Sequence, residues 1–189
     1  MKTLLINNFS PYIFNIINIL NDFNSDWTCF DCDSLYTLKV NLSDLLNNYD
    51  NVILSGRQQN SKIINKLNSY LVKSCLMLDK PLLGICYGGQ IFALTLGCTL
   101  KKMDKVKDIV KIDILKPTNL LPNYSSVEMF ESHNYCVSKL AKSFTLLGSS
   151  VNCTNEFFCF EGKPLFGTQF HPEKSGKPGR YLIENFLKL

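Results

Sequence analysis

A cysteine between two glycines is the feature of this sequence with the clearest chemical potential. Gly84, Cys86 and Gly88 form a Gly-x-Cys-x-Gly motif at the end of an apolar segment, residues 81–85. In such a motif the nucleophile lies on a sharp turn, because the glycines let the strand and the helix pass closely. The helix N-terminus favours the thiolate, and the next backbone N–H can bind an oxyanion. The motif predicts a nucleophilic thiol; a buried cysteine beside loop glycines is the alternative.

A histidine and a glutamate far along the chain could complete the machinery that a thiol nucleophile requires. The nucleophile needs a general base, and the base needs a group that orients its ring. His171 follows an apolar segment, and Glu173 lies two residues later, on the same face of an extended chain. The only other histidine is His133, for which we expect a role in shaping a pocket or in packing. The sequence therefore predicts His171 as the base and Glu173 as its orienting group, with a structural histidine as the alternative.

The elements that must position these residues follow from the apolar pattern. Apolar segments alternate with segments of helical periodicity, which predicts a parallel sheet covered on both faces. Strands are expected near residues 4–6, 27–32, 51–56 and 81–85, and helices near 13–20, 42–46, 63–71, 90–96 and 181–187. Short β-rich runs at 109–115, 127–130, 144–147, 157–160 and 165–170 predict a small antiparallel extension. The predicted fold is α/β, with three layers and a mostly parallel central sheet.

Length and composition narrow the classes of function. The chain has 189 residues, so we expect one domain spanning residues 1–189. The net charge of +4 is small and dispersed, which argues against a nucleic-acid partner. No segment approaches the ~20 continuous apolar residues of a membrane span, and no signal-peptide cleavage pattern follows the N-terminus. The sequence predicts a cytoplasmic protein without a membrane partner, in which the eight cysteines stay reduced.

Two other patterns are weaker signals. Cys29 and Cys32 form a C-x-x-C motif, but no second ligand pair follows at zinc spacing, so we expect no metal site. A lysine cluster lies between residues 101 and 107 and is typical of a solvated face, with docking of an acidic partner as the alternative.

Five segments resemble motifs of the class I (triad) glutamine amidotransferase family. Residues 84–90 read Gly-Ile-Cys-Tyr-Gly-Gly-Gln, and residues 167–173 read Gly-Thr-Gln-Phe-His-Pro-Glu. Residues 5–10 are similar to the opening strand of the family, residues 54–56 to its oxyanion strand, and residues 131–135 to the segment that holds the amino-acid end of the substrate. Five motifs in family order are far more specific than any one alone. The resemblance implies a flavodoxin-like fold.

The resemblance also implies a cysteine-based glutaminase without a metal or cofactor. Cys86 would attack the side-chain amide of L-glutamine and form a glutamyl thioester. His171, held by Glu173, would protonate the leaving ammonia and then activate water. The N–H groups of Gly56 and Tyr87 are expected to form the oxyanion hole.

Further residues are assigned to substrate binding by the same resemblance. Gln90, one turn after the cysteine, would bind the glutamine substrate, and Asn134 and Tyr135 would hold its α-amino and α-carboxyl groups. The sequence departs from the family at Gly89, where histidine is common, and after Gly56, where a glycine–proline run is usual. Here Gly56 is followed by residues 57–59, Arg-Gln-Gln, which predicts a differently shaped oxyanion hole.

The acceptor of the ammonia is expected to be a synthase on a separate polypeptide, because the chain has no residues left for one. Residues 5–20 resemble anthranilate and aminodeoxychorismate synthase subunits, residues 131–133 resemble the glutaminase subunit of GMP synthetase, and residues 171–176 resemble an imidazole glycerol phosphate synthase subunit. The first two are preferred because they fit longer stretches. A γ-glutamyl hydrolase that acts alone on a γ-glutamyl amine or peptide is the alternative from another class.

Overall fold

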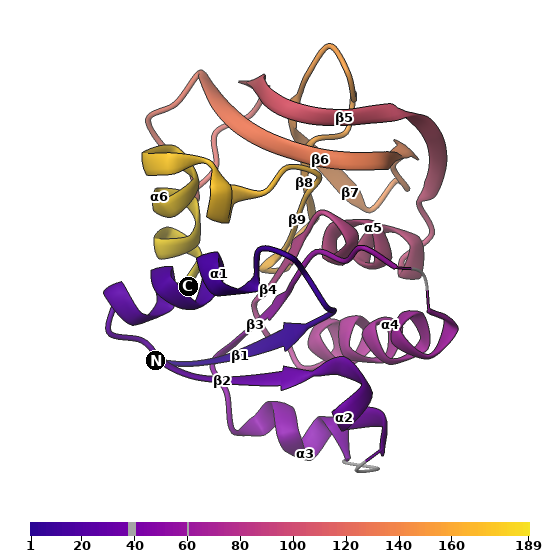
Figure 1. Cartoon of the computed structure of the whole chain (residues 1–189), viewed down its shortest axis with the longest axis vertical. Helices are drawn as coiled ribbons and strands as arrows, with labels where there is room; N and C mark the ends of the chain where they lie inside the picture. Colours follow the sequence, from indigo (N-terminus) through magenta and orange to yellow (C-terminus); the bar gives the residue numbers. More distant parts are fainter. Residues whose placement is uncertain (38–40, 60) are drawn as a thin grey trace.

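The computed structural model describes residues 1–37, 41–59 and 61–189. The strands of these residues form one mixed sheet of nine strands (Figure 1). Its parallel half has the order β2 (Asp26–Asp31), β1 (Lys2–Asn7), β3 (Asn51–Leu54), β4 (Leu82–Ile85) and β9 (Leu165–Thr168). The antiparallel half continues through β8 (Phe157–Phe160), β7 (Phe144–Ser149), β5 (Thr99–Ile114) and β6 (Ser126–Lys139). Strands are therefore parallel to their neighbours up to β9 and antiparallel to them beyond it.

Helices cover both faces of the parallel half, which confirms the predicted three-layer α/β fold. Leu4 and Ile6 point to the layer formed by α2 (Cys32–Thr37), α3 (Leu42–Asn47), α4 (Lys62–Met77) and α5 (Tyr87–Thr95). Leu5 points to the opposite layer, which contains α1 (Ile13–Asp22) and α6 (Gly176–Phe186). Side chains alternate along a strand, so a strand buried on both faces must be apolar throughout.

The antiparallel half is larger than the small extension predicted from the sequence. β5 and β6 pair over most of their length, from Thr99 with Lys139 to Asp113 with Ser126. The first part of β5 is rich in exposed lysines, which hide the strand from an apolar pattern. β7 pairs with β5 only at Asp113 and Ile114, so the rest of β5 is paired with β6 alone.

The prediction that residues 165–170 belong to the antiparallel extension is correct for only one edge of β9. Leu82 pairs with Leu165 and Ile85 with Thr168 in a parallel register, and the other edge of β9 is antiparallel to β8. A short buried strand has the same apolar composition in either orientation, so its sequence cannot reveal its direction. β9 therefore joins the two halves of the sheet.

Three helices begin where the apolar pattern did not place them, and one of them is α6, which begins at Gly176 rather than near residue 181. α2 was not predicted, and its first residue, Cys32, stands where the sequence suggested the end of a strand. α5 begins at Tyr87 rather than near Gln90, because the glycines of its first turn carry no apolar signal. Among residues 1–37, 41–59 and 61–189, no helix combines the length and apolarity needed to cross a bilayer.

Candidate active site

Cys86 lies in a strained turn between β4 and α5. Its φ is 49° and its ψ is −104°, values that a residue with a side chain rarely adopts. The flanking glycines permit this turn because a Cβ on Gly88 would lie 2.2 Å from the carbonyl oxygen of Leu54. The Cys86 N–H donates to the Thr168 carbonyl at 2.8 Å, which ties the turn to the end of β9. The thiol is thereby fixed at the N-terminus of a helix.

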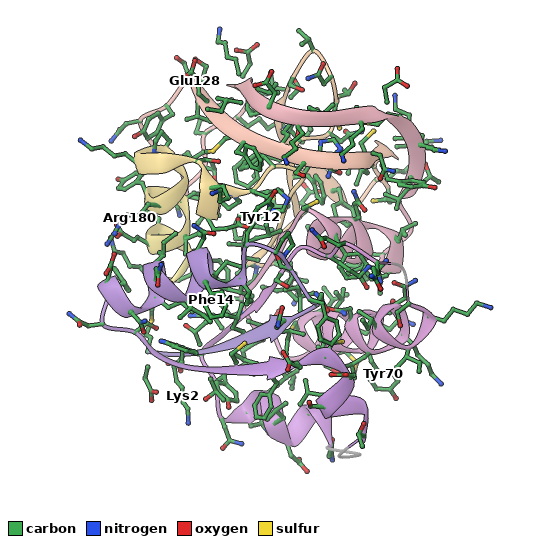
Figure 2. All side chains as sticks on the ribbon, in the orientation of Figure 1. Lys2, Tyr12, Phe14, Tyr70, Glu128 and Arg180 are labelled. Atoms are coloured by element: carbon green, nitrogen blue, oxygen red, sulfur yellow. The ribbon has the colours of Figure 1, made fainter. Side chains whose placement is uncertain are left out.

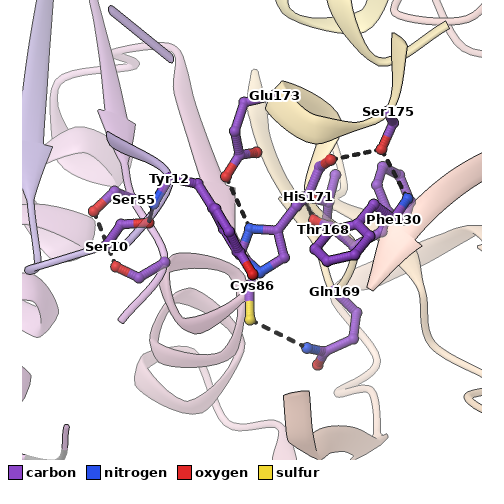
Figure 3. Close-up of polar contacts among 12 residues, drawn as sticks. Ser10, Tyr12, Ser55, Cys86, Phe130, Thr168, Gln169, His171, Glu173 and Ser175 are labelled. Carbon is purple, nitrogen blue, oxygen red and sulfur yellow. Dashed lines mark hydrogen bonds and ion pairs between the residues drawn. The ribbon is translucent and has the colours of Figure 1, made fainter. Parts of the chain in front are cut away.

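The side chains of His171 and Glu173 lie beside this thiol, with His171 between the other two (Figure 3). His171 Nδ1 is 2.8 Å from Glu173 Oε1, and both side chains are almost fully buried. Burial by itself would lower the pKa of His171, but the carboxylate of Glu173 and the sulfur of Cys86 raise it well above its ordinary value. The structure thus brings together the three residues that the sequence singled out.

Two hydrogen bonds hold the backbone of His171, and an aromatic contact holds its ring. Its N–H donates to the Phe130 carbonyl of β6 at 2.8 Å, and its carbonyl accepts from Ser175 Oγ at 2.6 Å. Ser175 Oγ also accepts the Phe130 N–H at 2.9 Å. Tyr12, between β1 and α1, places its ring edge against the imidazole with centroids 4.9 Å apart, and lies near the centre of the molecule in Figure 2. Sequence reasoning missed Tyr12.

Gln169 is a second residue that sequence reasoning missed. Its Nε2 donates to Cys86 Sγ at 3.7 Å, and its Oε1 accepts from Gln90 Nε2 at 3.1 Å (Figure 3 shows the first contact). Gln90 Nε2 also donates to the Tyr135 carbonyl at 2.8 Å. The signal was available, because Gln169 precedes His171 by two residues and an extended chain places both on one face. A hydrogen-bond chain therefore links β6 to the sulfur.

The residues expected to form the oxyanion hole lie on either side of the Cys86–His171 pair. Tyr87 supplies the first N–H of α5. Gly56 lies just after β3 and packs against the imidazole. A Cβ on Gly56 would lie 2.9 Å from His171 Cε1. Ser55 Oγ donates to the Gly56 carbonyl at 3.0 Å, which holds the peptide unit between Gly56 and Arg57.

A cavity of about 750 Å³ opens beside the thiol. Its lining includes Cys86, Tyr87, Gln90, Asn134 and Tyr135, so the residues predicted to bind substrate surround one space. Residues of β5 and β6 form one wall, and the loop after β3 forms another.

Arg57 replaces the glycine–proline run of the family at the edge of this cavity. Its guanidinium lies 3.6 Å from the centre of the Tyr87 ring, and Nη1 donates to Asn65 Oδ1 at 2.7 Å. Tyr87 Oη donates to the same Asn65 oxygen at 2.9 Å. Burial lowers the pKa of Arg57, but a guanidinium remains charged at neutral pH. Two cationic side chains, Arg57 and Lys105, therefore line the cavity.

These groups are suited to acyl transfer through a thioester. A thiol attacks a carbonyl carbon, an imidazole moves the proton, and backbone N–H groups stabilise the oxyanion. No group of three or more histidine, cysteine or acidic side chains is arranged to hold a metal ion within the part of the chain that the structure describes.

Comparison with known proteins gives consistent matches. Residues 4–189 match the family model described as "Glutamine amidotransferase class-I". A glutamine-hydrolysing subunit of GMP synthase from Methanosphaera stadtmanae is 30% identical, over 100% of this chain and 98% of that protein. The protein of the same name from Thermoplasma acidophilum is 32% identical over 149 residues, which are 77% of this chain and 74% of the relative.

Solved structures share the fold. A protein of Thermoplasma acidophilum assigned as a subunit of GMP synthase superposes with a TM-score of 0.86 at 26% identity, covering 100% of this chain and 92% of the other. A glutamine amidotransferase of Thermotoga maritima superposes with a TM-score of 0.80 at 17% identity, covering 100% and 96%, and this likeness concerns the fold alone.

Proposed function

This chain belongs to the class I glutamine amidotransferase family, and we propose that it hydrolyses L-glutamine to glutamate and ammonia for a separate synthase subunit. The observation that carries the proposal is the grouping of a thiol on a strained turn, a buried imidazole and a buried carboxylate at the edge of one cavity. The thiol must stay reduced to act, so we place the protein in the cytoplasm.

In the proposed reaction, Cys86 gives its thiol proton to His171, and the resulting thiolate Sγ attacks the side-chain amide carbon of glutamine. The carbonyl π electrons move onto oxygen, which the N–H groups of Gly56 and Tyr87 stabilise. His171 Nε2 is the free ring nitrogen, because Nδ1 is bound to Glu173, and it gives its proton to the leaving nitrogen as ammonia departs. Water, deprotonated by His171, then cleaves the glutamyl thioester and releases glutamate and the thiol.

The substrate is proposed to lie between Gln90 and the segment containing Asn134 and Tyr135. Gln90 Nε2 is already engaged by the Tyr135 carbonyl and by Gln169, so its Oε1 is the atom left to accept a donor from glutamine. The cavity is large enough for one amino acid, since binding sites for small molecules begin at about 300 Å³.

The acceptor is proposed to be the GMP-forming subunit of a GMP synthase. The two relatives from Methanosphaera and Thermoplasma are named as glutamine-hydrolysing parts of that enzyme, and they match most or all of this chain. Their names support an ammonia-supplying subunit over a stand-alone γ-glutamyl hydrolase and over the other two synthase types that short motifs resemble.

Covalent labelling tests the nucleophile. A diazoketone analogue of glutamine should attach one equivalent to Cys86, found by peptide mass spectrometry. Cys86→Ser should abolish the label, while Cys29→Ser, at a partly exposed cysteine outside the site, should leave it intact. Labelling of any other residue at the same rate would contradict the proposed site.

Reconstitution tests the partner. Glutamate release by the isolated chain should be slow, and it should rise when a GMP-forming subunit is added together with its substrates. Full activity of the chain alone, unchanged by the partner, would favour a stand-alone hydrolase.

A further inference from the structure

The side chain of Arg57 connects two backbone segments that follow different strands. Gly56 and Arg57 follow β3, whereas Tyr87 follows β4 and begins α5. The Arg57 guanidinium lies 3.6 Å from the centre of the Tyr87 ring, within the range of a cation–π contact. Each segment carries one of the N–H groups proposed to stabilise the oxyanion. The contact between the two side chains therefore joins the two parts of the proposed oxyanion hole.

Asn65 on α4 is the third member of this group. Its Oδ1 accepts from Arg57 Nη1 at 2.7 Å and from Tyr87 Oη at 2.9 Å. A carbonyl oxygen has two lone pairs, so this one atom can serve both donors. Burial raises the pKa of Tyr87, which keeps the phenol protonated as a donor. We call Arg57, Asn65 and Tyr87 the Arg57 clamp.

The loop after β3 depends on the Arg57 clamp for its position. Residues 57–59 contain no proline, so no ring restricts their φ angles. Gln58 and Gln59 are exposed, whereas Arg57 is half-buried against Tyr87. Ser55 Oγ donates to the carbonyl of the peptide unit between Gly56 and Arg57 at 3.0 Å. That peptide unit is thus held at its carbonyl by Ser55 and, through the side chain of Arg57, to the start of α5.

An oxyanion hole requires fixed geometry of this kind. Its donors stabilise the negative charge when they lie about 2.7–3.1 Å from the position of the developing oxyanion. The two proposed donors follow separate strands, so contacts between side chains help to set their spacing. A misplacement of about 1 Å can lower a rate about 10²-fold. A contact that fixes the loop relative to α5 therefore acts on the chemical step rather than on the affinity for substrate.

We propose that the Arg57 clamp fixes the spacing of the two oxyanion donors, which makes Arg57 and Asn65 positioning residues for the tetrahedral intermediate. This proposal rests on the glutamine hydrolysis proposed above and on its two donors, the N–H groups of Gly56 and Tyr87. It gives a function to Arg57, which the reaction above does not use. In this role neither side chain touches the reacting atoms.

Steady-state hydrolysis of glutamine by the whole chain tests this role. Arg57→Met keeps the bulk of the side chain and removes its charge and its donors. We expect kcat to fall by about 10-fold or more, but by less than the ~10²–10³-fold that removal of a donor costs. KM should stay within about twofold, since the lost contact acts in the transition state. Arg57→Lys, which can still donate to Asn65 and face the Tyr87 ring, should recover part of kcat.

Arg180→Met is the matched control, because Arg180 is the only other arginine of the chain and lies on the outer surface of α6 (Figure 2). Its side chain pairs with Asp22 and Glu184, outside the proposed site. The kcat and KM of this variant should equal those of the wild-type protein. Melting temperatures establish that each variant is folded.

Asn65→Leu tests the Arg57 clamp without a change of charge. It removes the acceptor that Arg57 and Tyr87 share, so kcat should fall in the same way. Alkylation of Cys86 by iodoacetamide forms no oxyanion, so its rate should be unchanged. In the double variant Arg57→Met/Asn65→Leu, the loss of kcat should be smaller than the product of the two single losses, because both substitutions remove one contact. Losses that multiply would contradict a shared contact.

Four further results would overturn the proposal. The first is wild-type kcat in folded Arg57→Met. The second is a rise in KM with unchanged kcat, which would make Arg57 a ligand of the substrate. The third is a loss that occurs only when a synthase subunit is present, which would place Arg57 at the interface between subunits. The fourth is an alkylation rate that falls as much as kcat in Asn65→Leu, which would indicate a general disturbance of the site.

The wild-type protein separates this proposal from the one on which it rests. A wild-type chain that releases no glutamate from glutamine, alone or with a synthase subunit, would contradict the proposed glutaminase function. An active wild-type chain with equally active Arg57→Met and Asn65→Leu variants would contradict the Arg57 clamp alone.

Discussion

At the scale of single residues, the proposed chemistry depends on buried charges that stabilise one another. His171 is almost fully buried, and an isolated imidazole in such a place would lose its proton. Glu173 reverses this tendency through a 2.8 Å contact, and the sulfur of Cys86 adds to the effect. The carboxylate thus sets both the orientation of the ring and its ability to hold a proton.

Replacement of the Glu173 carboxylate should therefore lower the rate of glutamine hydrolysis strongly. In Glu173→Gln the shape is kept and the charge is lost, so we expect kcat for glutamine hydrolysis to fall by about 10²–10⁴-fold. Steady-state glutamate release measures the loss. Glu161→Gln, at an exposed glutamate in the turn after β8, should retain wild-type kcat. A Glu173→Gln variant with nearly full activity would exclude the orienting role.

Gln169 should contribute to the reactivity of the thiolate. Its N–H donates to Cys86 Sγ, and Gln169→Met keeps the bulk without that donor. We expect iodoacetamide to alkylate Cys86 about 10-fold more slowly in this variant at neutral pH, because a hydrogen bond to a charged group is lost. Gln58→Met, at an exposed glutamine on the rim of the same cavity, serves as the control and should react at the wild-type rate.

The buried proton of Glu156 should be detectable in the pH dependence of stability. The pKa of this group rises from 4.5 to about 9 on folding. Between these values the folded protein holds a proton that the unfolded chain releases, so the group lowers the free energy of unfolding as pH rises. Glu156→Gln lacks this proton and should gain stability relative to wild type with rising pH, by at most about 1.4 kcal/mol per pH unit.

Urea denaturation between about pH 5 and pH 9 measures this difference. Because both proteins share every other titratable group, a constant difference across the range would show that Glu156 is ionised in the folded protein.

At the scale of elements, the site depends on how closely β4 and α5 approach their neighbours. Gly88 lies against the Leu54 carbonyl of β3, so Gly88→Ala should destabilise the fold by several kcal/mol, more than the usual 1–3 kcal/mol of an overpacked core, since backbone blocks the new methyl group. Thermal unfolding compares it with Gly162→Ala. Gly162 has a φ of +72° but open space around it, so only about 1–2 kcal/mol of backbone strain is expected there. Equal losses at the two positions would contradict the close packing.

Most elements could be predicted from the sequence because burial imposes a pattern on it. β1, β3 and β4 are apolar on both faces, and α1 repeats its apolar residues at helical spacing. The long β5 could not be predicted in full, because its exposed lysines follow no apolar alternation. The direction of β9 depends on its neighbours rather than on its own residues. Tyr12 acts through its contact with a distant segment, which a single sequence does not display, whereas the position of Gln169 two residues before His171 could have revealed its role.

At the scale of the whole molecule, the site lies where the two halves of the sheet meet. Cys86 comes from the parallel half, His171 follows the joining strand β9, and His133 comes from the antiparallel half. His133 lies on the edge strand β6, opposite a part of β5 that pairs with β6 alone. Two-stranded ribbons are weakly stable by themselves. Amide hydrogens of residues 100–109 should therefore exchange faster than those of β4 and β9, as measured by mass spectrometry on the whole protein.

The position of β9 also has a consequence for synthesis of the protein. A ribosome releases the elbow at Cys86 long before it releases β9 and His171. Until then β4 has an unpaired edge in the middle of the future sheet, and the thiol lacks its proton acceptor. A nascent chain thus exposes an unpaired strand edge and lacks the proposed base, and both conditions end when β9 is inserted and His171 follows it.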